Sequence, residues 1–299
     1  MRCRVWFSRR GRDNGTVGVE HYENFPVASV LCPPRIRAAV LAIYGYARTA
    51  DDLADEGDAP AAHRQAQLQA YRDDLRRIYA GQAPTPRWAH VFAPLQRAIT
   101  QHRLPLQHLE DLLDAFLQDV GNPRYADREQ LVDYCRRSAN PVGRLLLHLY
   151  GLADEDALRR ADCICTALQL VNFWQDCSVD LPRGRVYLPA ADARHYGVDL
   201  GEPALLRDSP ATQAMLRELC AWARQTMLDG ADLALQLRGR AGWELRLVVQ
   251  GGLRILEKIE HADYRVLSHR PVIGARDMLP IAWRALTMRH QGSPTGSIE

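Results

Sequence analysis

The sequence predicts an all-α protein built as a single domain. Apolar residues recur at three- and four-residue spacing along most of the chain, as in helices that each bury one face. No stretch shows the sustained alternation of valine, isoleucine or threonine with polar residues that is typical of strands. The chain has 299 residues, which is near the upper size that one hydrophobic core supports, roughly 250–300 residues.

Eight segments carry the helical periodicity, and turns rich in glycine and proline, such as 57–60, separate them. The expected helices cover residues 34–55, 61–80, 87–103, 105–120, 127–150, 154–180, 208–237 and 241–268. We expect residues 1–19 to be a poorly ordered tail, residues 20–285 to form the domain, and residues 286–299 to be a flexible tail.

Composition excludes several classes of protein. The net charge of +2 gives no broad electrostatic reason to bind nucleic acid. The seven cysteines are irregularly spaced and include no CxxC pair, which favours reduced thiols in the cytoplasm. No apolar run reaches the roughly 18–20 residues of a spanning helix. A lipid substrate would therefore be met from the surface of the inner membrane.

The first chemical feature is the segment IYGYARTADDLAD. On a helix, side chains three and four residues apart share a face. One face therefore presents an aromatic hydroxyl, a guanidinium and two or three carboxylates, which belong to Tyr44, Arg48, Asp51, Asp52 and Asp55. A solvated acidic helix end would show the same pattern. The apolar LAIYGYA stretch favours a buried helix instead, and buried carboxylates need partners or a metal.

The second feature is a polar stripe on an otherwise apolar helix in the segment ALQLVNFWQDCSVD. Gln169, Asn172, Asp176 and Asp180 lie at positions i, i+3, i+7 and i+11. A buried hydrogen-bond network is the alternative for one such stripe. Two stripes in one helical chain favour a shared site.

Two arginines, Arg183 and Arg185, follow the second stripe in a turn after Pro182. Guanidinium groups pair with phosphate oxygens in a forked geometry. Ligands that are all oxygen favour magnesium, which is usually held by few carboxylates together with substrate phosphates. The two stripes and their arginines therefore predict a diphosphate bridged by magnesium ions.

Five strings along the chain resemble the squalene and phytoene synthase family of head-to-head prenyl synthases. The resemblance covers the chain from about His21 to Met278, and the strings read HYENFPVAS, ARTADDLAD, YCRRSANPVG, LVNFWQDCSVD with RGRVYLP, and GLRILEKIEHADYRVLSHRP. The resemblance implies the isoprenoid synthase fold, with helices around a central cavity between the two aspartate motifs.

The resemblance also implies roles for individual residues. Magnesium would be bound by Asp51, Asp55, Asp176 and Asp180, with Asp52 assisting. The diphosphate site would be lined by His21, Tyr44, Arg48, Gln169 and Asn172, and contacted by Arg183 and Arg185. Tyr134 is a candidate for stabilising a carbocation, because aromatic faces attract cations.

Departures from the common family pattern point to one bacterial branch, the hydroxysqualene synthases of hopanoid biosynthesis. The central helix carries Asn140 and Pro141 where a glycine-containing sequence is common, and Gln175 precedes the second motif where arginine is common. This branch is expected to ionise presqualene diphosphate and capture the cation with water, releasing hydroxysqualene and diphosphate. A presqualene diphosphate synthase would supply the substrate.

The departures suggest a hypothesis for water capture. Asn140 could orient a water, and a kink at Pro141 could free a backbone carbonyl, because proline removes a helical hydrogen bond. The equally weighted alternative is that Asn140 caps a broken helix.

Three other functions stay open at this point. Within the family, the chain could condense two farnesyl diphosphates to presqualene diphosphate, or act as a phytoene or squalene synthase. A di-iron carboxylate bundle would need Glu-x-x-His pairs, and no glutamate here has that neighbour. A non-catalytic helical partner protein would be expected to have damaged aspartate motifs, and both motifs are intact.

Overall fold

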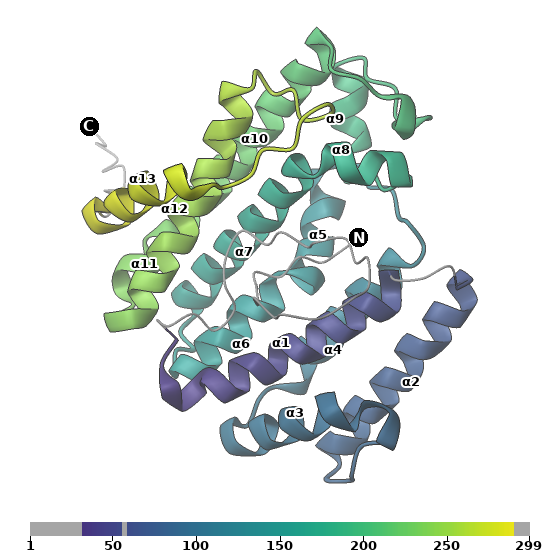
Figure 1. Ribbon diagram of the computed structural model, residues 1–299, viewed down its shortest axis with the longest axis vertical. Coiled ribbons are helices and arrows are strands. Elements are labelled where there is room, and N and C mark those ends of the chain that lie inside the picture. Colours follow the sequence, from purple (N-terminus) through teal and green to yellow (C-terminus); the bar gives the residue numbers. More distant parts are fainter. Residues whose placement is uncertain (1–31, 56–58, 290–299) are drawn as a thin grey trace, which may run out of the picture.

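The computed structural model describes residues 32–55 and 59–289, which form helices joined by turns and contain no β-strand (Figure 1). The prediction of an all-α fold is confirmed. The helices are α1 Pro34–Asp55, α2 Ala61–Tyr79, α3 Ala89–His102, α4 Leu106–Asp119, α5 Arg128–Ser138, α6 Asn140–Tyr150, α7 Glu155–Gln175, α8 Cys177–Asp180, α9 Ala190–His195, α10 Pro210–Ala231, α11 Leu233–Gln236, α12 Gly239–His261 and α13 Ala275–Thr287. Short 3-10 turns lie at η1 Pro86–Trp88, η2 Leu181–Arg183 and η3 Pro203–Leu205.

Helix α7 lies in the middle of the molecule (Figure 1). It packs against α5, α6, α10 and α12, while α1 packs against α2, α3 and α4. Because neighbours surround α7, apolar residues cover most of its C-terminal half, and Trp174 is fully buried there. The single polar stripe on this helix is therefore held inside the protein.

Three expected helices are each divided in the structure, and the segment 208–237 breaks at Asp232, between α10 and α11. The segment 127–150 breaks at Ala139, and Pro141 lies in the first turn of α6. A proline is tolerated in that turn because its missing N–H would have no partner in the helix. The predicted kink inside one helix is therefore wrong. The segment 154–180 likewise breaks at Asp176, between α7 and α8.

Gly143, in the central SANPVG string, permits α6 to lie close to α7. A Cβ atom added at this position would come within 2.6 Å of Cys165 Sγ. A side chain at this position would require the Cys165 side chain to move, so glycine favours close packing of the two central helices. Among the described residues, no helix is long and apolar enough to cross a membrane.

Helix α13 was not among the expected segments, and it extends past the expected domain boundary at residue 285. Pro280 lies inside it and interrupts the pattern by which helices are predicted. Ion pairs to the buried Asp277 anchor this helix on α12. Asp277 accepts hydrogen bonds from Arg254 Nε at 2.8 Å and from Lys258 Nζ at 2.7 Å, both on α12.

Candidate active site

The first acidic motif occupies the C-terminal end of α1, where Asp51 is only 2% exposed. The C-terminus of a helix carries a partial negative charge, so carboxylates there are unfavourable. Arg48 offsets part of this charge, because its guanidinium lies 2.6 Å from Asp52 Oδ1 and 3.3 Å from Asp51 Oδ2. The carboxylates that remain at this helix end repel one another and oppose folding, and a bound cation would remove that repulsion.

The second acidic motif has the same relation to its helix. Asp176 and Asp180 are buried at the C-terminal end of α7 and α8. Arg270, in the loop after α12, donates from Nε to Asp176 Oδ1 at 2.6 Å. This arginine lies 94 residues away from Asp176, so no spacing pattern in the sequence could have identified it. Both motifs therefore bring negative charge to the negative end of a helix.

The fold brings the two motifs together. Arg185, after the η2 turn, donates from Nη2 to Asp55 Oδ1 at 3.0 Å across a separation of 130 residues. Its backbone N–H also donates to the carbonyl of Asp180 at 3.0 Å. One residue thus contacts both motifs, as expected if the motifs serve a single ligand.

Sequence reasoning missed Asp119, the last residue of α4. It is 4% exposed, and the Tyr134 hydroxyl donates to its Oδ2 at 2.8 Å. Burial raises the pKa of the Asp119 carboxyl well above its usual range, and the charges of Asp55 and Asp180 raise it further. Asp119 therefore lies close enough to both motifs to share their electrostatic environment. No motif marks it, because it reads as an ordinary acidic helix end.

A cluster of aromatic rings lies beside Asp119, which it contacts through the Tyr134 hydroxyl. Phe173 and Tyr187 stack with centroids 4.0 Å apart and nearly parallel planes. Tyr134 lies 6.2 Å from each of these rings and 5.6 Å from Tyr125. The predicted cation-stabilising residue is therefore one member of an aromatic cluster beside Asp119, and such faces attract positive charge.

Asn140 is buried and points toward α7, where its Oδ1 accepts a hydrogen bond from the Thr166 hydroxyl at 3.0 Å. The alternative of a capping role is wrong, because Ala139 is the N-cap residue of α6 and no side chain caps that end. The carbonyl end of Asn140 thus links α6 to α7. Its role in holding a water stays a prediction.

The other predicted residues are placed as follows. Gln169 is buried, and its Nε2 has no hydrogen-bond partner within the part of the chain that the structure describes. Tyr44 packs against the core formed around α1, and Asn172 is half-buried. Arg183 is exposed in the η2 turn. His21 lies outside the described residues.

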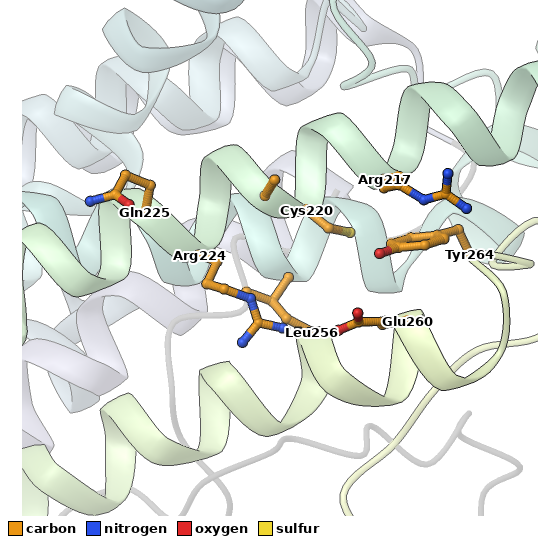
Figure 2. A pocket seen from close by; sticks show the side chains of 8 residues that line it. Arg217, Cys220, Arg224, Gln225, Leu256, Glu260 and Tyr264 are labelled. Carbon is orange, nitrogen blue, oxygen red and sulfur yellow. Dashed lines mark hydrogen bonds and ion pairs between the residues drawn. The ribbon is translucent and has the colours of Figure 1, made fainter.

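A separate pocket of about 330 Å³ lies between α10 and α12, and Figure 2 shows its side chains. None of the predicted site residues lines it. Its charged groups already have partners, because Arg224 pairs with Glu260 at 3.4 Å and Arg217 lies over the Tyr264 ring. The pocket therefore gives no sign of serving the aspartate motifs.

The donor atoms of the two motifs fit magnesium in type. Among the described residues, no group of three or more His, Cys, Asp or Glu side chains is placed to hold a metal ion. Magnesium normally takes few carboxylates and completes its shell with water and phosphate oxygens. Asp119 Oδ1 is buried and accepts no hydrogen bond from the described residues. Such a buried carboxylate oxygen would be satisfied by a cation.

Comparison with known proteins places this geometry in a family. The sequence profile of the squalene/phytoene synthases matches residues 19–277. The chain belongs to this family. Among squalene/phytoene synthases, it is 35% identical to the hydroxysqualene synthase of Rhodopseudomonas palustris over 81% of this chain and 80% of that protein. It is also 33% identical to the presqualene diphosphate synthase of the same organism, over 68% and 70% of the two chains.

Solved structures show the same relation to the squalene/phytoene synthases. Squalene synthase HpnC from Alicyclobacillus acidocaldarius superposes with a TM-score of 0.74 at 36% identity, over 82% of this chain and 90% of that one. The isoprenoid synthase fold is confirmed. The central cavity that the resemblance implies stays a prediction.

Gln175 joins the second motif to the loop that carries Arg270. Its Nε2 donates to the carbonyl oxygen of Pro271 at 2.6 Å, and its side chain is fully buried. Consecutive residues of the motif, 175 and 176, thus contact consecutive residues of the loop, 271 and 270. This departure from the family pattern therefore positions the arginine that pairs with Asp176.

Replacing Gln175 with leucine is expected to lower the free energy of unfolding by about 1–3 kcal/mol, because a buried carbonyl loses its partner. Urea denaturation measures this change. The matched control is Gln225→Leu, where an exposed glutamine on α10 donates to Asp229 on its own helix. Equal changes in the free energy of unfolding for the two variants would contradict the role of Gln175 in holding the loop that carries Arg270.

Proposed function

We propose that this chain is a hydroxysqualene synthase. It would cleave the carbon–oxygen bond of presqualene diphosphate, release diphosphate and form a new carbon–oxygen bond between the rearranged cation and water. One proton leaves the captured water, and no reductant is consumed. The support is the pair of buried aspartate motifs joined through Arg185, in a chain whose relatives include hydroxysqualene synthases.

Magnesium would be held by Asp51, Asp55, Asp176 and Asp180, with Asp52 assisting. When bound, it would neutralise the charge that develops on the departing diphosphate. Arg48, Arg185 and Arg270 now lie beside carboxylates. Once the cation neutralises those carboxylates, the guanidinium groups can turn to phosphate oxygens, for which their forked geometry is suited. Gln169 Nε2 offers a further donor.

The aromatic cluster and Asn140 would act after the diphosphate has left. The faces of Tyr134, Phe173 and Tyr187 stabilise positive charge without offering a nucleophile. Asn140 would orient the attacking water through its amide, while Thr166 holds its carbonyl end. A presqualene diphosphate synthase would supply the substrate, and the protein would work in the cytoplasm at the surface of the inner membrane.

The deciding experiment incubates the protein with presqualene diphosphate and magnesium, without reductant, in water labelled with oxygen-18. We expect hydroxysqualene that carries the label, together with diphosphate, and no product when a chelator removes the magnesium. Squalene, or no turnover, would contradict the assignment. Consumption of farnesyl diphosphate alone would identify the alternative, a condensing transferase.

The role of Asn140 has its own test in the same assay. Asn140→Gly removes the amide, and we expect the labelled alcohol to decrease relative to total diphosphate released. Asn140→Ser, which retains a small polar group, is the matched control and should keep more of the hydration. Unchanged hydration in the glycine variant would remove Asn140 from the mechanism.

A further inference from the structure

Exposed apolar side chains gather on one short segment of the surface. Seven large hydrophobic residues are exposed in the part of the chain that the structure describes. Five of them lie between residues 272 and 286, and they are Val272, Met278, Leu279, Trp283 and Leu286. Leu279 is 81% exposed and Trp283 is 66% exposed. We refer to these five side chains as the α13 patch. Large exposed apolar side chains concentrated on one helix in this way are typical of an interaction site.

The α13 patch is held in place by the opposite face of the helix. Ile281 and Ala285 are buried, and Asp277 is tied to α12 by Arg254 and Lys258. Burial by itself would raise the pKa of Asp277, but hydrogen bonds from Gly274, Lys258 and Arg254 hold it well below the usual range. The helix is thus firmly docked through one face while the other presents apolar side chains outward.

Most of the charged residues in the segment that carries the patch are basic. Residues 265–289 contain five arginines, and their one acidic residue is the buried Asp277. Arg276 and Arg289 are exposed and make no ion pair with the described residues, whereas Arg284 pairs with Glu257. The patch is apolar and is bordered by guanidinium groups that make no ion pair with the described residues. It is therefore complementary to a partner surface in which a layer of anionic groups covers an apolar interior.

We propose that the α13 patch docks the protein onto an anionic phospholipid surface. Leucine, methionine and tryptophan side chains would enter the boundary between headgroups and acyl chains, where tryptophan is favoured. The flanking arginines would pair with lipid phosphates, because basic side chains near a membrane surface are attracted to anionic headgroups. A second copy of the chain fits less well, because two-fold packing of the patch would place the arginines against one another.

The test measures sedimentation of the full chain with vesicles in the absence of substrate. We expect binding to vesicles that mix phosphatidylglycerol with phosphatidylcholine, weaker binding to phosphatidylcholine alone, and loss of binding at high salt. The double substitution Leu279→Gln and Leu286→Gln should lower the bound fraction at least about tenfold, as expected when roughly 1.4 kcal/mol or more is lost. Both residues are exposed, so the fold should be retained.

The matched control is Leu205→Gln. Leu205 is 63% exposed, as Leu286 is, but it lies on η3 away from the α13 patch. It should bind vesicles as the unchanged protein does. Lipid-quenched fluorescence, compared between the unchanged protein and Trp283→Phe, should show that Trp283 enters the bilayer interface.

Three results would overturn the proposal: no vesicle binding by the unchanged protein, equal binding by the double variant, or equal loss of binding in Leu205→Gln. A fourth overturning result could come from sedimentation velocity measured without vesicles. A dimer that the double substitution dissociates would show that the patch pairs two copies instead. Because substrate is absent throughout, none of these outcomes depends on the proposed reaction.

Discussion

Replacing Asp176 with asparagine is expected to lower kcat/KM for diphosphate release by about 10²–10³-fold, the usual loss when one preorganised electrostatic contact to the reacting group is removed. Asparagine keeps the size of the side chain and removes the charge that Arg270 and a cation would share. Steady-state rates at several magnesium concentrations measure the loss. The apparent magnesium affinity should fall in parallel.

The control for Asp176 is Asp192→Asn. Asp192 also pairs with an arginine, since Arg128 Nη2 lies 2.6 Å from its Oδ1, but it belongs to α9 and contacts neither motif. We expect this substitution to leave kcat/KM within about threefold. A comparable loss in both variants would mean that the effect of Asp176 is on folding, and the proposed metal role would then be wrong.

Replacing Asp119 with asparagine is expected to stabilise the metal-free protein while lowering its activity. The buried carboxylate lies near the charges of Asp55 and Asp180, which raise its pKa. Asparagine removes that repulsion and still accepts the Tyr134 hydrogen bond. The free energy of unfolding at pH 7 should rise by about 1–2 kcal/mol, and activity should fall, as is common when a strained functional residue is replaced.

The pH dependence provides a second readout for Asp119. Because burial raises the pKa of this carboxyl in the folded state, the folded protein binds the proton more tightly than the unfolded chain does. The protonated Asp119 carboxyl therefore contributes to the free energy of unfolding at low pH. This contribution is lost as pH rises above about 4, the usual carboxyl pKa, because the unfolded chain releases the proton first. The stability of the Asp119→Asn variant should fall less over that rise than that of the unchanged protein, when both are measured without magnesium.

Tyr134→Phe is the matched substitution, and we expect it to change the free energy of unfolding in the opposite direction. It removes the hydroxyl that donates to Asp119 Oδ2 and leaves the buried carboxyl with one interaction fewer, so the free energy of unfolding should fall by about 1–3 kcal/mol. If Asp119→Asn destabilises the protein as much as Tyr134→Phe does, Asp119 is a structural residue rather than part of the charged site.

The aspartate motifs were predictable because helical spacing is local. Tyr44, Arg48 and Asp51 share a face of one helix, and this relation depends only on the geometry of 3.6 residues per turn. The same is true of Gln169, Asn172 and the start of the second motif. Five ordered strings then sufficed to predict the family and its all-α fold, which the comparisons confirm.

Helix breaks were less predictable, since a proline is compatible with either a kink or a first turn. Pro141 lies in the first turn of α6, and the chain breaks before it at Ala139. Pro280 lies inside α13, whose position is maintained by the contacts of Asp277 with α12. Pro141 thus occupies a position that proline favours locally, whereas Pro280 is accommodated inside a helix that contacts with α12 hold in place.

The amino-acid sequence predicted two groups of carboxylates with their flanking arginines as the site, and it identified the family to which the chain belongs. The tertiary structure alone brought Arg185 to Asp55, Arg270 to Asp176 and Asp119 toward both motifs. These pairs lie on different helices and loops, and no periodic pattern relates them. Their proximity follows from the burial of apolar faces around α7. This packing brings the C-terminal ends of α1, α4 and α7, which carry the carboxylates, close to one another.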